Sequence, residues 1–165
     1  MHLALTGSAG FIGQEFLNSI HKEKKIKKIT LIVNKKNPKI KKKFNKINFV
    51  HLDLRKKVEN VKFNFKIDTM VHFGEYSRPY IMINVYKHNI KIFDNVIKIL
   101  NLTKCKKLIY ISSTEAVGPN IKKNKLVESS ICRPITDYGR SKLRNEIKLK
   151  KIKKMNFKYI ILRPT

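Results

Sequence analysis

The stretch Leu3-Ala4-Leu5-Thr6-Gly7-Ser8-Ala9-Gly10-Phe11-Ile12-Gly13 decides the fold of this chain. A short apolar run leads directly into three glycines. After them, Ile12, Phe16 and Ile20 recur at four-residue spacing, which predicts a helix with one buried stripe. Glycines between a strand and a helix permit a tight turn whose backbone amides can approach a pyrophosphate at the helix N-terminus. The chain has only 6 glycines, so three at this spacing and in this place are informative.

Five further apolar runs follow, with helical patterns between several of them. We expect strands at 3–6, 29–33, 47–50, 69–73, 108–112 and 159–162, and long helices near 82–100 and 136–154. Near-continuous apolar strands that alternate with helices are typical of a parallel sheet covered on both faces. The sequence therefore predicts an α/β fold, a doubly wound parallel sheet of about six strands, with no linker that divides the chain.

The composition is strongly biased toward three residue types. The 165 residues include 32 lysines, 23 isoleucines and 15 asparagines, and the formal net charge is +27. All three types are encoded by codons rich in A and T, so a base bias explains the charge without any partner. Only 6 residues are arginine, the side chain that nucleic-acid-binding proteins favour. We therefore expect no specific nucleic-acid partner, and a functional basic surface stays as the alternative.

Several protein classes are excluded by simple features of the sequence. No run approaches the roughly 20 apolar residues of a membrane span, and the N-terminus runs straight into the first strand without a signal peptide. We therefore expect a cytoplasmic protein. Cys105 and Cys132 lack the spacing of a metal site, so we expect reduced thiols and no metal.

A second motif, Tyr138-Gly139-Arg140-Ser141-Lys142, lies in the last expected helix. Residues four apart share a helix face, so the Lys142 ammonium can lie beside the Tyr138 phenol and lower its pKa from about 10 toward that of a general acid or base. The pattern alone is weak, because about one such match is expected by chance among 6 tyrosines. Ser113 strengthens it: this residue ends the fifth strand, and strand carboxyl ends face the ligand crevice.

With these motifs in place, the sequence resembles the NAD-dependent epimerase/dehydratase family, the extended short-chain dehydrogenases/reductases. The resemblance follows the family's order through 6–13, 53–54, 71–74, 84–85, 111–113, 138–142 and 162–164. It implies a Rossmann domain over residues 1–165 that binds NAD or NADP. It also implies a nucleotide-sugar substrate that is oxidised by hydride transfer and then epimerised, dehydrated or reduced. Family members continue beyond this point with a substrate lobe, so we expect the cofactor-binding part alone, truncated after the sixth strand.

The resemblance also implies roles for individual residues. The pyrophosphate would be held by Gly7, Gly10, Phe11, Ile12 and Gly13, the adenine by Asp53 and Leu54, and the rest of the dinucleotide by Phe73, Gly74 and Asn84. Ser113 would hydrogen-bond the reacting hydroxyl and Tyr138 would be the general acid/base. Lys142 would grip the nicotinamide ribose and lower the pKa of Tyr138. Relatives commonly dimerise through the two long helices, which makes a homodimer one expected arrangement.

Some positions depart from the family pattern at the cofactor end. The second strand ends without the usual acidic ribose ligand, and Lys35 and Lys36 follow it, which favours NADP weakly. Gly74-Glu75 replaces the usual Ala-Ala pair. We expect Glu75 to be solvated, with a cleft-facing position as the alternative. Lys87-His88 replaces Gly-Thr, which weakens the assignment of Asn84.

Other departures concern the reaction. The pair Thr114-Glu115 lacks the aspartate of the family's dehydratases, so we expect dehydration less than epimerisation or reduction. Val117 stands where the family usually has a tyrosine before the glycine of this loop. The run 112–120 has some likeness to relatives that act on steroid or flavonoid-like alcohols, which is a second enzyme hypothesis. A third is a remnant without catalysis that binds a dinucleotide or a polyanion. Substrate identity depends on the lobe that is absent from these residues.

Overall fold

The computed structural model of the chain describes residues 1–41, 44, 46–58, 61–77, 84–119, 126–152 and 156–165. The elements in chain order are β1 (His2–Thr6), α1 (Phe11–Ser19), η1 (Ile20–Lys22), β2 (Lys28–Val33), β3 (Ile47–His51), β4 (Thr69–His72), α2 (Val85–Leu102), β5 (Lys107–Ile111), η2 (Thr114–Ala116), α3 (Asp137–Lys151) and β6 (Lys158–Leu162). The two η elements are single 3-10 turns.

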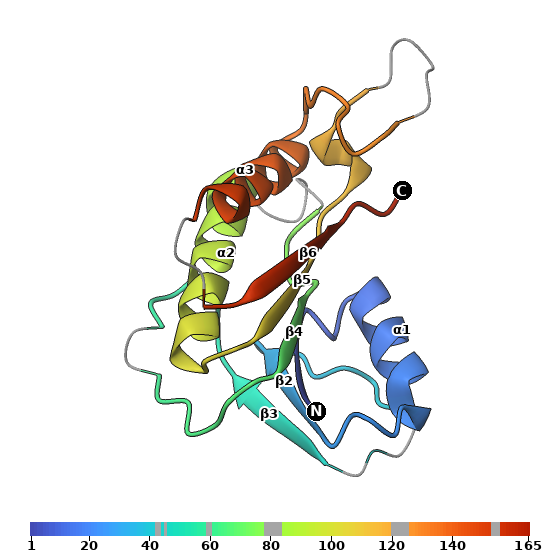
Figure 1. Cartoon of the computed structure of the whole chain (residues 1–165), viewed down its shortest axis with the longest axis vertical. Helices are drawn as coiled ribbons and strands as arrows, with labels where there is room; N and C mark the ends of the chain where they lie inside the picture. The colour runs from blue at the N-terminus through green and yellow to red at the C-terminus, as the bar shows by residue number, and fades with distance from the viewer. Residues whose placement is uncertain (42–43, 45, 59–60, 78–83, 120–125, 153–155) are drawn as a thin grey trace.

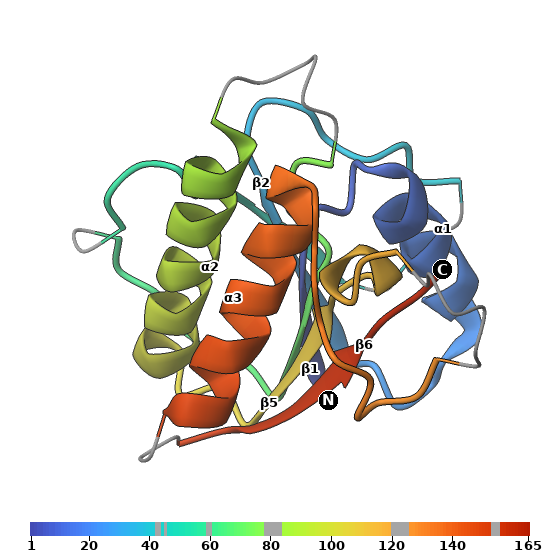
Figure 2. The ribbon, with the colours of Figure 1, turned by 90° about the horizontal axis from the view of Figure 1, so that it is seen from above.

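The six strands form one parallel sheet in the order β3-β2-β1-β4-β5-β6. Helix α1 covers one face, and α2 and α3 lie side by side on the other (Figures 1 and 2). The predicted doubly wound parallel sheet is confirmed, and every strand begins and ends within one residue of its predicted bounds. The strand order reverses between β1 and β4, and ligands of such sheets bind at the carboxyl ends of the strands at this point.

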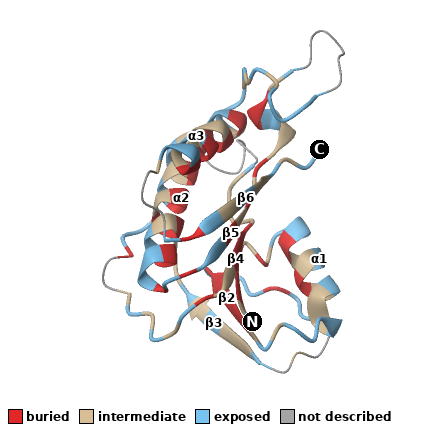
Figure 3. Cartoon of the chain, viewed as in Figure 1, coloured by how far each residue is buried: buried red, intermediate tan, exposed pale blue. Residues whose placement is uncertain are grey.

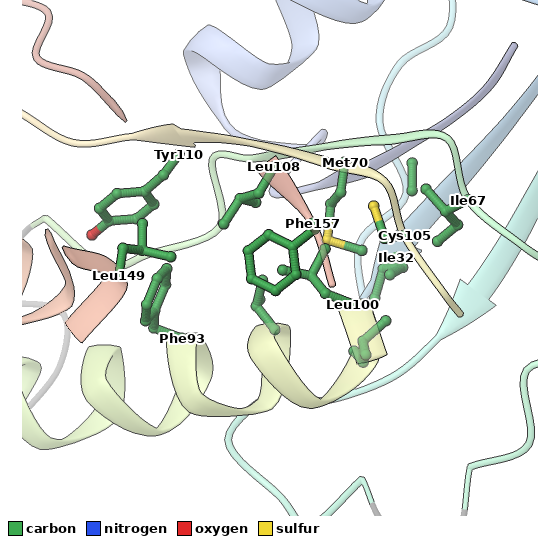
Figure 4. Packing of buried hydrophobic residues seen from close by; sticks show 13 residues of the cluster. Ile32, Ile67, Met70, Phe93, Leu100, Cys105, Leu108, Tyr110, Leu149 and Phe157 are labelled. Carbon is green, nitrogen blue, oxygen red and sulfur yellow. The ribbon is translucent and has the colours of Figure 1, made fainter. Parts of the chain in front are cut away.

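Two apolar clusters hold the layers together. The larger one lies between the sheet and α2 and α3, where Phe93, Met70 and Tyr110 are fully buried (Figure 4). The smaller one lies between the sheet and α1 and is centred on Leu5, Leu17 and Leu31. The central strands are buried from both sides (Figure 3), which explains their near-continuous apolar sequence.

The buried face of α1 differs from the predicted stripe. Gly13 and Leu17 are buried, Phe16 and Ile20 are half-buried, and Ile12 is 53% exposed. The small Gly13 faces the strand–helix turn, because an added Cβ there would lie only 2.3 Å from the Gly7 carbonyl oxygen. This close approach turns Ile12 away from the core.

The two long helices start and end close to their predicted bounds. Helix α2 begins at Val85, and residues 82–83 of the prediction lie outside the described residues. Helix α3 ends at Lys151, and predicted residues 153–154 also lie outside them. The buried face of α2 includes two asparagines, Asn89 and Asn95, among its apolar residues.

Candidate functional site

The glycine turn brings the ends of β1 and β4 and the start of α1 into close contact. Gly7 has a φ of +71°, a left-handed conformation that favours glycine. A Cβ on Gly7 would lie 2.5 Å from the Gly74 amide nitrogen, and one on Gly13 would lie 2.3 Å from the Gly7 carbonyl oxygen. Two of the predicted cofactor-binding glycines, Gly7 and Gly13, are therefore required by close backbone packing, whereas a Cβ on Gly74 would lie 3.1 Å from its nearest neighbours.

The first turn of α1 leaves polar groups without protein partners. Gly10 caps the helix without a side-chain hydrogen bond, and no acidic residue lies in the first turn. The buried Ser8 Oγ beside it has no hydrogen-bond partner among the described residues. Phe11 is 88% exposed at the same helix end. Free amides at a helix N-terminus, with a buried unpaired hydroxyl next to them, fit an anionic group such as a pyrophosphate.

Two cavities meet at this turn. One, of about 500 Å³, extends over the ends of β1 and β2, and the other, of about 370 Å³, extends toward β5 and α3. Both are lined by Gly7, Gly10, Phe73 and Glu75. The glycine turn thus lies where the two cavities share their lining, so a dinucleotide with its pyrophosphate at the turn could extend into both.

The first cavity contains the predicted adenine-binding residues. It is lined by Asp53 and Leu54, and also by Lys35, Lys36 and Arg55. The Arg55 guanidinium donates to both carboxylate oxygens of Asp53, at 2.9 and 2.7 Å, and this hydrogen bonding lowers the pKa of Asp53. This cavity is therefore lined by one ion pair and by two lysines that form no ion pair with any other described residue.

A buried asparagine of α2 fixes the loop that carries these residues. Asn95 Nδ2 donates to the carbonyl oxygens of Leu54, at 2.8 Å, and Lys56, at 2.6 Å. Asn89 holds the segment that follows β4 in a similar way. It accepts a hydrogen bond from the Tyr76 amide and donates one to the Tyr76 carbonyl oxygen, both at 2.9 Å. The sequence did not identify either asparagine as important. The chain has 15 asparagines, and no sequence pattern distinguishes the two buried ones from the others.

The second cavity brings the predicted catalytic residues together. It is lined by Ser113, Tyr138 and Lys142, together with Phe11, Ile12 and Gly13. Thr136 caps α3 by accepting from the Gly139 amide at 2.9 Å, and it donates to Glu115 Oε2 at 2.8 Å. Glu115 thus has a structural role next to the motif. A Cβ on Gly139 would lie 2.3 Å from the Glu115 carbonyl oxygen, so this glycine allows α3 to approach η2.

The surroundings of Tyr138 differ from the prediction in one respect. The Lys142 ammonium does lie over the Tyr138 ring, 5.3 Å from its centroid. However, Lys142 Nζ is also 2.9 Å from Glu75 Oε2. The pKa of Tyr138 is raised, not lowered: burial is the main cause, followed by the negative charges of Glu75 and Glu115. Glu75 itself is not solvated, since its side chain is only 1% exposed.

Asn84 lies apart from both cavities. It is exposed, has a φ of 62°, and lines a groove between α2 and α3 together with Asp137 and Arg140. Its predicted contact with the dinucleotide stays a prediction. Within the described ranges, no helix is long and apolar enough to cross a bilayer, and no group of three or more His, Cys, Asp or Glu could hold a metal ion.

The sequence model of the NAD dependent epimerase/dehydratase family matches residues 3–165. The chain belongs to this family. Among curated proteins, an uncharacterised protein of Methanocaldococcus jannaschii is 30% identical over 88% of this chain and 50% of its own length.

Solved family structures show the same fold. UDP-glucose 4-epimerase of Thermus thermophilus, solved in complex with NAD, has a TM-score of 0.83 at 22% identity and covers 99% of this chain. The Thermotoga maritima UDP-glucose 4-epimerase has a TM-score of 0.82 at 22% identity, again over 99% of the chain. UDP-N-acetylglucosamine 4-epimerase of Methanobrevibacter ruminantium has a TM-score of 0.80 at 22% identity, over 98% of it. The chain spans only 54%, 55% and 54% of these structures, respectively, about half of their length.

Proposed function

We propose that these residues form the cofactor-binding part of an NAD(P)-dependent epimerase or reductase that acts on a nucleotide sugar. The observation that carries the proposal is the pair of cavities joined at the glycine turn. One cavity contains Asp53 and Leu54, and the other contains Ser113, Tyr138 and Lys142. This arrangement fits a dinucleotide whose reactive end lies beside an acid/base residue.

Each residue has a chemical task in this proposal. The amides of Phe11 and Ile12 bind the pyrophosphate at the start of α1. Ser113 orients the reacting hydroxyl of the sugar, and Tyr138 exchanges a proton with that oxygen. Lys142 binds the nicotinamide ribose. When bound, the nicotinamide supplies hydride transfer, and the protein supplies orientation and electrostatics.

We propose that the chain prefers NADP. Lys35 and Lys36 line the adenosine cavity, and no acidic residue stands at the end of β2 to accept the ribose hydroxyls. Asp53 lies in the same cavity, but Arg55 already binds both of its carboxylate oxygens. A phosphate on the ribose would therefore meet two lysines that are not paired with any acidic side chain in the described part of the chain.

Epimerisation or reduction is favoured over dehydration. The chain has Thr114 where an aspartate would supply the acid for dehydration, and Glu115 accepts a hydrogen bond from Thr136 outside the catalytic cavity. In this proposal the nucleotide of the sugar is bound outside these residues, which span about half of the length of the solved relatives.

Cofactor binding tests the proposal directly. NADH and NADPH fluorescence titrations of the chain should show saturable binding, and Gly10→Trp should abolish it by filling the space over the glycine turn. Leu102→Trp, at an exposed position on the end of α2, is the matched control and should bind normally. If the wild-type chain binds neither cofactor, the proposal is wrong.

The acid/base role of Tyr138 needs a second measurement. In a form of the protein that turns over a nucleotide sugar, Tyr138→Phe should lower kcat by about 100-fold or more. The Kd for the cofactor should stay within about twofold, because the lost hydroxyl takes part in chemistry rather than in binding. Equal losses of turnover and affinity would contradict the assigned role.

A further inference from the structure

A buried carboxylate lies in the wall that the two cavities share. Glu75 follows β4 by three residues, and its side chain is 1% exposed. An ionised carboxylate is rarely buried to this extent unless it is paired and hydrogen-bonded. The contacts of Glu75 therefore indicate what it does in the site.

The two oxygens of Glu75 have different partners. Oε1 accepts hydrogen bonds from Tyr110 Oη at 3.1 Å and from Asn145 Nδ2 at 3.0 Å, and it lies 3.4 Å from His72 Nε2. Oε2 lies 2.9 Å from Lys142 Nζ. Burial lowers the pKa of His72, and Glu75 offsets this only in part. The closest ion pair of the cluster is that of Glu75 with Lys142.

Lys142 is held in place by the same cluster. Its ammonium, 2% exposed, donates to the Ile111 carbonyl oxygen at 2.6 Å and lies 4.9 Å from the centroid of the Tyr110 ring. With Glu75 as the charged partner, the ammonium has a fixed position in the absence of any cofactor. The same ammonium lies 5.3 Å from the centroid of the Tyr138 ring, so Glu75 places a negative charge next to the only ammonium known to contact this ring among the described residues.

We propose that Glu75 is a positioning residue that holds the Lys142 ammonium and cancels its charge, and thereby keeps Tyr138 in its protonated, proton-donating form. The inference rests on the proposed function of Tyr138 and Lys142. A carbonyl carbon of the sugar can then accept a hydride from a reduced nicotinamide while its oxygen takes the phenolic proton. The products are an alcohol, an oxidised nicotinamide and a tyrosinate that regains a proton from water. The arrangement therefore populates the form of Tyr138 from which a reduction step starts.

The charged groups around Tyr138 agree with this role. Lys142 faces it from the same helix, Glu75 from the loop after β4 and Glu115 from η2. The two carboxylates disfavour a tyrosinate and outnumber the one ammonium that favours it, and burial disfavours it further. The pKa of Tyr138 is raised in accordance with this balance.

Tyrosine ionisation in the cofactor-free chain tests the inference. Carbon-13 labelling of the tyrosine ring and NMR at about pH 9.5, where an ordinary lysine is still mainly charged, measure the ratio of tyrosinate to tyrosine, and Tyr138→Phe identifies the signal. Glu75→Gln keeps the hydrogen-bonding shape but removes the charge, so Lys142 acts on Tyr138 alone. We expect the ratio at Tyr138 to rise at least tenfold, which corresponds to about one pKa unit. An unchanged ratio in a folded Glu75→Gln chain would overturn the inference.

Two further variants separate charge from packing. Glu75→Gln combined with Lys142→Met removes both charges, and a neutral pair of similar volume is often tolerated in a core. In this double variant, the ratio should return to within about threefold of wild type; a tenfold fall would mean that the Lys142 charge acts on Tyr138 in the wild type. The comparison of the double variant with wild type tests the inference even if Glu75→Gln alone does not fold. Glu115→Gln, the matched control, should change the ratio less than Glu75→Gln, and an equal or larger change would contradict the inference.

These measurements are independent of the proposed function. They need no cofactor, so a chain that fails to bind NADH or NADPH would refute the cofactor proposal and leave the NMR result intact. A chain that binds the cofactor but shows no effect of Glu75→Gln would refute only the role of Glu75.

Discussion

Replacing Gly13 by alanine tests the close packing at the glycine turn. The new Cβ would lie 2.3 Å from the Gly7 carbonyl oxygen, 3.0 Å from the Gly7 carbonyl carbon and 3.1 Å from the Ser8 Cα. To reach 3.0 Å from the oxygen, the shortest distance that real Cβ atoms show, α1 or the turn must shift by about 0.7 Å. All three neighbours are backbone atoms, so no side chain can rotate away.

Two effects of opposite sign compete in this variant. Alanine is favoured over glycine inside a helix by about 1 kcal/mol. Overpacking against fixed neighbours costs about 1–3 kcal/mol, and backbone neighbours place this site near the upper end. We therefore expect Gly13→Ala to lower the free energy of unfolding by about 1–2 kcal/mol. A shift of this size at the pyrophosphate site should also weaken cofactor binding by about 10-fold or more.

Gly10→Ala in the same turn is the matched comparison. Its Cβ would meet only the Gly7 carbonyl oxygen, at 3.2 Å, and its φ of −79° suits any residue. Stability should fall by only about 0.5 kcal/mol through the poorer helix cap, while affinity falls because a methyl group now lies where the pyrophosphate approaches. Urea unfolding and NADH titration measure both quantities. A Gly13→Ala chain as stable as wild type would refute the steric argument, and unchanged affinity in Gly10→Ala would refute the pyrophosphate position.

Three other predictions concern charged residues. Changing Lys35 and Lys36 together to alanine should raise the Kd for NADPH about tenfold more than the Kd for NADH, and an unchanged ratio in fluorescence titrations would reject the phosphate contact. Arg163→Met leaves the buried Glu146 carboxylate unpaired and should lower the free energy of unfolding by about 3–5 kcal/mol, with recovery when Glu146→Gln is added. The pKa of Glu75 is lowered from 4.5 to about 2 because Lys142 and His72 outweigh burial. The stability that it contributes is therefore complete above about pH 4.5 and lost as pH falls toward 2, and acid unfolding of Glu75→Gln should be flatter in that window.

The strands could be predicted from the sequence because their environment is simple. Strands such as β1 and β2 are covered on both faces, so almost every residue in them is apolar. The ends of each apolar run therefore mark the ends of the strand. The glycine turn could be predicted for a similar reason: Gly7 and Gly13 meet backbone atoms at distances that no side chain permits. In both cases, a local constraint restricts the residue types at each position.

The face of α1 and the role of Glu75 could not be predicted in this way. Ile12 fits the helical period as well as Leu17 does, and only the contact between Gly13 and Gly7 decides which face meets the sheet. Glu75 is near Lys142 through the pairing of β4 with β5 and the packing of α3, which no local pattern records. The sequence feature that pointed to Glu75 is a carboxylate just after a buried strand, at a position where the family usually has a small apolar residue.

The acidic residues therefore carry more information than the net charge of +27 does. Against 38 basic residues, any pattern of lysines arises easily by chance, but only 11 positions are acidic. Two of these, Glu75 and Glu146, have side chains that are 1% exposed and pair with Lys142 and Arg163, respectively. A buried carboxylate costs several kcal/mol unless its partner is correctly placed, so each such pair indicates a specific constraint. Glu146 links α3 to β5 and β6 through Ser112 and Arg163, whereas Glu75 has its partner in the catalytic motif. For this reason, the function of the site is best tested at Glu75 rather than at the abundant lysines of the surface.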